Sequence, residues 1–112
     1  MNSEYAKLTH IVGEVTAYFL KLNSKDISFN IKIDDEFKHI MVNAKDVTLS
    51  PMQLQKMTVQ LSNPRQPEIE GYYWNLTGGD HVGSELRLVS SMTDLVEATV
   101  SMKEGTTVRL KR

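Results

Sequence analysis

The stretch Ile27-Ser28-Phe29-Asn30-Ile31-Lys32-Ile33 alternates strictly between apolar and polar side chains. Successive side chains of a β-strand point to opposite faces, so this alternation predicts a strand with one buried face. The branched isoleucines favour the same conformation. A polar turn follows at Asp34-Asp35-Glu36, and the alternation resumes with apolar residues at 40, 42 and 44. The sequence from 27 to 44 therefore predicts a β-hairpin.

The residues before this hairpin carry a helical pattern. Apolar side chains recur at steps of three or four positions, at Tyr5, Leu8, Val12, Val15, Phe19 and Leu22. This spacing is typical of an amphipathic helix whose apolar stripe faces a core. Asn2 or Ser3 can cap its first turn, and Asn23-Ser24 is expected to end it. Gly13 lies inside the helix, where its small size favours the close approach of another backbone.

The region after the hairpin contains further helix signals. Ser50-Pro51 combines a capping residue with proline at the first helical position, which predicts a short helix. The last residues of this helix, 58–61, also fit a strand. A second short helix is expected from Glu68 to Leu76, because Gly78-Gly79 supplies a C-terminal cap. Residues 84–92 fit either a helix or a strand.

A second hairpin is predicted after these helices. Apolar and polar residues alternate from Val96 to Met102, a turn follows at Lys103-Glu104-Gly105, and Val108 and Leu110 continue the pattern. The two hairpins are expected to join in one antiparallel sheet, whose apolar face needs a covering layer. We therefore predict one α+β domain, residues 1–112. Its N-terminal amphipathic helix and short helices pack on one face of an antiparallel sheet made from two β-hairpins.

The composition excludes several classes of protein. The 112 residues match the size of one domain, and the absence of cysteine excludes disulfides, thiolate zinc sites and a cysteine nucleophile. The sequence starts without a signal-peptide pattern and has no apolar run of about 18 residues. We therefore expect a cytoplasmic, bacterial-type protein without a membrane partner. The 13 basic and 14 acidic residues are spread evenly, which argues against a nucleic-acid partner.

The loop from Thr77 to Ser84 holds the most functional-looking residues. Its candidate ligand-binding residues are Gly78, Gly79, Asp80, His81 and Ser84. Glycines let backbone N–H groups approach a phosphate, although a helix cap followed by a connecting loop explains the same residues. Neighbours along a chain rarely form a catalytic triad, and the three histidines lack the spacing of metal ligands. We therefore expect no catalytic residue, no metal site and no cofactor, and we favour a protein that is not an enzyme.

Two apolar features favour association with another chain. Ile11 and Tyr18 widen one side of the helical stripe, which lets the helix meet its own copy. Tyr73 and Trp74 lie in an aromatic cluster, in which Trp74 either covers the end of the sheet or forms an interface hot spot. Our first hypothesis is a small non-enzymatic protein that acts through protein–protein contact, as a homodimer or with another protein. The alternative is a small-ligand or nucleotide/phosphate-binding domain that uses the loop 77–84.

Overall fold

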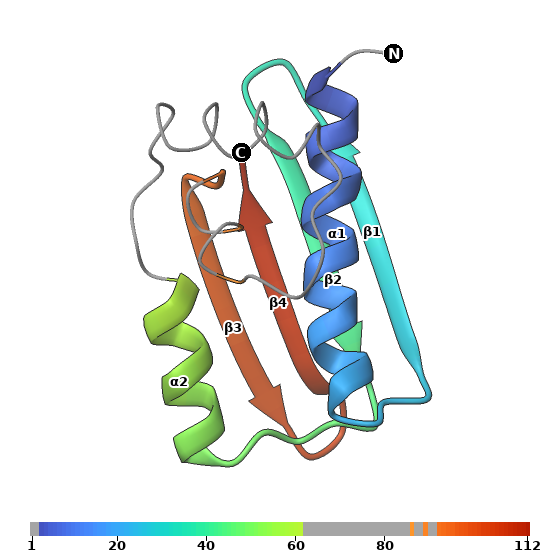
Figure 1. Ribbon diagram of the computed structural model, residues 1–112, viewed down its shortest axis with the longest axis vertical. Coiled ribbons are helices and arrows are strands. Elements are labelled where there is room, and N and C mark those ends of the chain that lie inside the picture. The colour runs from blue at the N-terminus through green and yellow to red at the C-terminus, as the bar shows by residue number, and fades with distance from the viewer. Residues whose placement is uncertain (1–2, 62–85, 87–88, 90–91) are drawn as a thin grey trace.

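The computed structural model describes residues 3–61, 86, 89 and 92–112, and this part of the chain forms two helices and four strands. In chain order they are α1 (Ser3–Lys21), β1 (Ile27–Ile33), β2 (Lys38–Ala44), α2 (Pro51–Leu61), β3 (Leu95–Ser101) and β4 (Gly105–Lys111). Figure 1 shows a single sheet, with α1 in front of β1 and β2 and α2 beside β3. The predicted α+β fold, with an N-terminal helix and two hairpins, is confirmed. The helix predicted from Glu68 to Leu76 lies outside the described residues.

Backbone pairing sets the strand order of the sheet as β1-β2-β4-β3, with every neighbouring pair antiparallel. The first hairpin pairs Ile27 with Ala44 at its open end. The second hairpin consists of β3 and β4. The two hairpins meet through their second strands, β2 and β4, where Val42 lies opposite Val108. β1 and β3 are consequently the two edges of the sheet.

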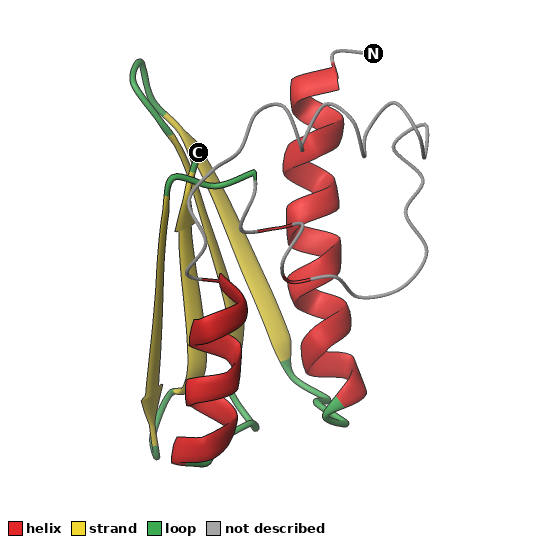
Figure 2. Cartoon of the chain, turned by 60° about the vertical axis from the view of Figure 1, so that its left-hand side comes forward, coloured by secondary structure: helices red, strands yellow, loops and turns green. Residues whose placement is uncertain are grey.

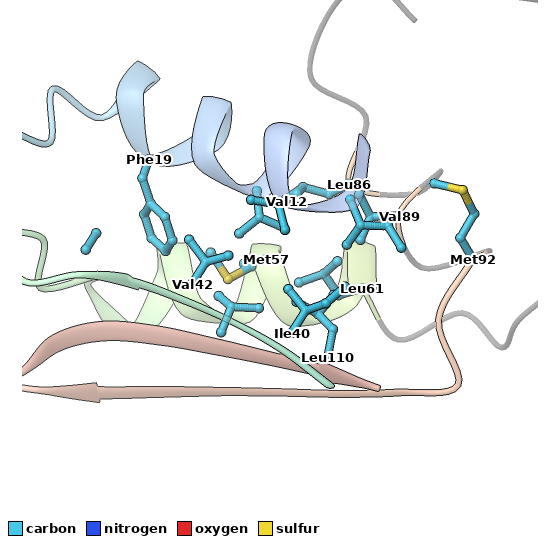
Figure 3. Packing of buried hydrophobic residues seen from close by; sticks show 14 of the residues in the cluster. Val12, Phe19, Ile40, Val42, Met57, Leu61, Leu86, Val89, Met92 and Leu110 are labelled. Atoms are coloured by element: carbon cyan, nitrogen blue, oxygen red, sulfur yellow. The ribbon is translucent and has the colours of Figure 1, made fainter. Parts of the chain in front are cut away.

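Both described helices cover the same face of the sheet, as predicted (Figure 2). The space between the helices and the strands is filled by buried apolar side chains, which are Leu8, Ile11, Val12, Val15, Phe19, Ile40, Val42, Ala44, Leu49, Met57, Leu61, Leu86, Val89, Met92, Val108 and Leu110. Figure 3 shows Val12 and Phe19 of α1 pointing toward the strands that carry Val42 and Leu110. Leu86 and Val89, from the ambiguous segment 84–92, are helical.

α1 ends at the residues that the sequence predicts. Asn23 adopts the left-handed conformation with a φ of 65°, which asparagine tolerates better than most residues. The Ser24 N–H donates to the Phe19 carbonyl at 3.1 Å, which closes the last turn of the helix. Ser24 Oγ and the Lys25 N–H both donate to the Asp46 carboxylate, at 2.6 and 2.7 Å. These bonds tie the end of α1 to the segment that follows β2.

α2 begins as predicted, with Ser50 as its cap. The Gln53 N–H donates to Ser50 Oγ at 3.2 Å, and the Ser50 N–H donates to Gln53 Oε1 at 2.9 Å. This reciprocal pair is a capping box. Pro51 occupies the first helical position, where its missing N–H is not needed. The helix continues to Leu61, so residues 58–61 are helical and do not form the alternative strand.

Candidate functional site

Most of the residues predicted to form a ligand site or an interface lie outside the described part of the chain. They are Gly78, Gly79, Asp80, His81 and Ser84 of the loop 77–84, together with Tyr73 and Trp74. The predicted binding role of the loop and the predicted interface role of the two aromatic residues both stay predictions.

The two remaining interface candidates, Ile11 and Tyr18, belong to α1. Ile11 is fully buried in the core. Tyr18 is partly buried, and its ring stands edge-on to that of Phe19 with the ring centroids 5.6 Å apart. Burial raises the pKa of Tyr18. Within a single chain both side chains support the core, and their contact with a second copy stays a prediction.

β1 is an edge strand, and no described strand lies beyond it. In an antiparallel pair, residues that bond to the neighbouring strand alternate with residues whose N–H and C=O groups point away from it. The Asp34 N–H donates to the Phe37 carbonyl at 3.0 Å. At the other end of the hairpin, the Asp26 carbonyl accepts from the Lys45 N–H, also at 3.0 Å. The even-numbered residues of β1 therefore bond to β2, and the odd-numbered ones direct their backbone groups outward.

The same edge strand exposes large apolar side chains. Phe29 is 59% exposed and Ile33 is 54% exposed, although both belong to the side of the sheet that the helices cover. The alternation in the sequence predicts burial for both residues, and for these two that prediction is wrong. The reason is the position of α1, which packs over β2 as well as β1 and so leaves the outer margin of the sheet uncovered.

α1 lies in front of β1 and β2 (Figure 1), and it carries two exposed apolar side chains of its own. Glu4 reaches Lys38 at the start of β2 and Arg112 after β4, so its side of the helix faces the centre of the sheet. Tyr5 lies roughly 100° further round the helix and Leu20 roughly 60° beyond it, which places both on the flank above β1. Each is 57% exposed. These two residues with Phe29 and Ile33 are called the α1–β1 flank below.

The opposite face of the sheet carries no described helix (Figure 2). The strand register arranges its side chains in rows that cross the strands. One row contains Lys32, His39 and Lys111, and the next contains Asn30, Met41, Arg109 and Glu97. A depression of about 440 Å³ lies over these two rows and is called the open-face depression below.

The turn between β1 and β2 fixes one rim of this depression. Asp34 Oδ2 lies 2.9 Å from His39 Nε2. The N–H groups of Phe37 and Glu36 donate to Asp34 Oδ1 at 2.7 and 2.9 Å, and these bonds, with the contact to His39, lower the pKa of Asp34 to about 2. Lys111 Nζ lies 4.2 Å from the centroid of the Phe37 ring, a cation–π contact that holds the ammonium group near the rim.

Neither surface follows from sequence reasoning alone. Lys32 and Arg109 lie far apart along the chain, and only the pairing of β2 with β4 brings their strands into one sheet. A usable signal was nevertheless present, because the alternation within each strand assigns both cations to the polar side. The exposure of Phe29 had no such signal, since it depends on where the helix layer ends.

Comparison with known proteins identifies no relative. No protein-family model matches the chain, and no curated protein or solved structure matches it. Across the described residues, no helix combines the length and apolar character needed to cross a membrane. In the same residues, no three His, Asp or Glu side chains gather as metal ligands would. The candidate functional surfaces of this chain are therefore the α1–β1 flank and the open-face depression.

Proposed function

We propose that this protein acts through protein–protein contact and that its partner is a second copy of itself, joined along β1. One observation carries the proposal: Phe29 and Ile33 combine outward-facing backbone groups with exposed apolar side chains. An added strand satisfies those backbone groups and covers those side chains in a single step.

β1 lacks the features that usually keep sheet edges from pairing with other chains. Such edges are protected by charged residues, proline, bulges or a covering segment. Within the seven residues of β1 the only charged side chain is Lys32, and proline is absent. The register with β2 runs from Ile27 to Ile33 without a bulge. β3, at the other edge, differs because its described side chains include no large exposed apolar one.

A two-fold axis makes this edge complementary to its own copy. When Ile31 pairs with its copy, Phe29 lies opposite the copy of Ile33, and each of these pairs exchanges backbone hydrogen bonds. Tyr5 and Leu20 of each copy then lie above the junction. This pairing extends the two four-stranded sheets into one continuous sheet.

The area available on the α1–β1 flank suits a dimer with a small interface. A strand of seven residues is roughly 23 Å long. Tyr5 and Phe29 are each more than half exposed, and aromatic side chains of this size bury about 150–250 Å². Only the exposed part of each side chain can be buried on contact, so the α1–β1 flank with its backbone edge supplies less than the roughly 800 Å² per partner that a standard interface buries.

Analytical ultracentrifugation tests the proposal. The unmodified chain is expected to sediment as a dimer. The double variant Phe29→Lys/Ile33→Lys is expected to sediment as a monomer, because unpaired ammonium groups are costly to bury. Circular dichroism checks that the variant keeps its fold.

Met52→Lys is the matched control, since Met52 is 68% exposed on α2 and lies away from the α1–β1 flank. The dimer is expected to persist in this control. An unmodified chain that stays monomeric at every concentration, or a double variant that still dimerises, would overturn the proposal.

A further inference from the structure

Six of the nine residues that line the open-face depression have charged or hydrogen-bonding side chains, and the other three, Ile40, Met41 and Leu110, are apolar. Three of its lining residues, Lys32, Arg109 and Lys111, carry positive charge, and Glu97 is the acidic residue among them. Among the described residues, no acidic side chain lies within ion-pair distance of the three cations. The nearby carboxylate of Asp34 is already engaged by His39 and by backbone N–H groups. The depression therefore offers positive charge that the described chain leaves unpaired.

The strand register brings these cations close to one another. Lys32 and Lys111 lie in one row, separated only by His39, and adjacent strands are about 4.8 Å apart. Arg109 lies two residues before Lys111 on the same strand and side, roughly 7 Å away along β4. The long side chains of all three residues can therefore converge on one anion. The Phe37 ring under Lys111 Nζ already holds one of them on this face.

We propose that the open-face depression binds a small phosphate ester that also carries hydroxyl groups. A guanidinium group binds a phosphate through paired hydrogen bonds, and ammonium groups add charge. Asn30 and Glu97 stand in the same row as Arg109 and line the same depression, where they offer partners to hydroxyl groups. The volume of about 440 Å³ falls in the range of roughly 300–1,000 Å³ that is typical of small-molecule pockets.

A small ligand fits this face better than a nucleic-acid strand does. Sheets that bind single-stranded nucleic acid stack the bases on aromatic side chains. The strand residues on the open face include no Phe, Tyr or Trp, and the ring of His39 stands edge-on to the Phe37 ring, which is itself covered by Lys111. The formal net charge of the chain is −1, which gives no broad attraction for a polyanion.

Titration of the isotope-labelled protein, followed by amide chemical shifts at constant ionic strength, tests this site. The probes are ribose 5-phosphate, inorganic phosphate and ribose. Ribose 5-phosphate is expected to shift amides of β1, β2 and β4 around the depression. Inorganic phosphate is expected to bind more weakly at the same place, and ribose is expected to have no effect.

Arg109→Gln is expected to weaken ribose 5-phosphate binding about tenfold or more, because it removes a charged hydrogen-bond donor. Lys56→Gln is the matched control, since Lys56 is an exposed cation on α2, across the sheet from the depression. The Lys56→Gln variant is expected to bind ribose 5-phosphate as tightly as the unmodified chain does.

Three results would overturn the site. They are the absence of shifts with both phosphate compounds, equal weakening in both variants, and tighter binding of a short single-stranded RNA than of ribose 5-phosphate. Equal affinity for inorganic phosphate and ribose 5-phosphate would overturn the hydroxyl contacts assigned to Asn30 and Glu97.

Discussion

Arg112, which follows β4, forms two hydrogen bonds with the carboxylate of Glu4 at the start of α1. Nε lies 2.6 Å from Oε1, and Nη2 lies 3.0 Å from Oε2. The Arg112 side chain is only 2% exposed, and its Nη1 also donates to the Met92 carbonyl at 2.7 Å. Lys38 Nζ adds a contact of 3.4 Å to Glu4 Oε1. This cluster joins the first turn of α1 to the two central strands of the sheet.

Replacing Glu4 with glutamine is expected to destabilise the protein by about 2 kcal/mol at neutral pH, because hydrogen bonds to charged groups are the stronger ones and a buried guanidinium loses its counter-ion. Arg112, through its hydrogen bonds, lowers the pKa of Glu4 from 4.5 to about 2. The contribution of Glu4 to the free energy of unfolding is thus complete above pH 4.5 and is lost as the pH falls toward 2. Urea denaturation at several pH values measures it.

Glu36→Gln serves as the control, because Glu36 is exposed in the turn between β1 and β2. Its free energy of unfolding is expected to change by less than about 0.5 kcal/mol. If Glu4→Gln and the unmodified chain lose stability equally between pH 5 and pH 2, the assigned role of Glu4 is contradicted.

Two glycine-to-alanine substitutions are expected to act in opposite directions. Gly105 has a φ of +73°, and a Cβ there would collide with the carbonyl oxygens of Ala44 and Lys45. Gly105→Ala should therefore cost about 2 kcal/mol or more. At Gly13, by contrast, no described atom apart from the neighbouring backbone of α1 itself lies within 4 Å of the Cβ position, so the close approach of another backbone that the sequence suggests is not seen among the described residues.

Gly13→Ala should raise the free energy of unfolding by about 0.5–1 kcal/mol, because alanine has the higher helix propensity. Thermal melts of both variants compare the two effects. A stabilised Gly105→Ala variant or a destabilised Gly13→Ala variant would contradict the conformations described for these residues.

Thr106 links β4 to the segment between β2 and α2. Its hydroxyl donates to the Val47 carbonyl at 2.8 Å and accepts from the Leu49 N–H at 3.4 Å, in a fully buried position. Thr106→Val is expected to cost about 1–3 kcal/mol, since both backbone groups lose a partner. Thr99→Val, the same change at an exposed position of β3, is expected to stay within about 0.5 kcal/mol in chemical denaturation. Equal costs at the two positions would contradict this role.

A proline at position 29 is expected to prevent dimerisation without preventing folding. The Phe29 N–H points away from β2, so Phe29→Pro removes a donor toward a second copy while sparing the bonds within the hairpin. The variant is expected to fold and to sediment as a monomer. Asn30→Pro removes a bond to β2 and is expected to lose much of its strand signal in circular dichroism. A Phe29→Pro variant that folds and still dimerises would place the dimer contact elsewhere.

Local patterns predict the elements of this fold better than their arrangement. The alternation from Ile27 to Ile33 and the pair Ser50-Pro51 act over a few residues, so the first hairpin and the start of α2 were both predicted. The joining of β2 to β4 leaves no local signal, because either strand of each hairpin presents a similar alternation. The sequence does not predict the α1–β1 flank for a related reason. Phe29 follows the pattern of a buried residue, but the width of the helix layer decides its exposure.

The central pairing of the sheet also sets the order in which the chain is expected to fold. Each hairpin joins neighbouring segments, and such hairpins form within about 1–10 μs. Asn43 and Thr107, by contrast, pair across β2 and β4 although they are 64 positions apart. Closing that loop costs chain entropy before any contact offsets it. We therefore expect docking of the two preformed hairpins to limit the folding rate, with Val42 and Val108 in the folding nucleus and the hairpin turns affecting chiefly the earlier, faster steps.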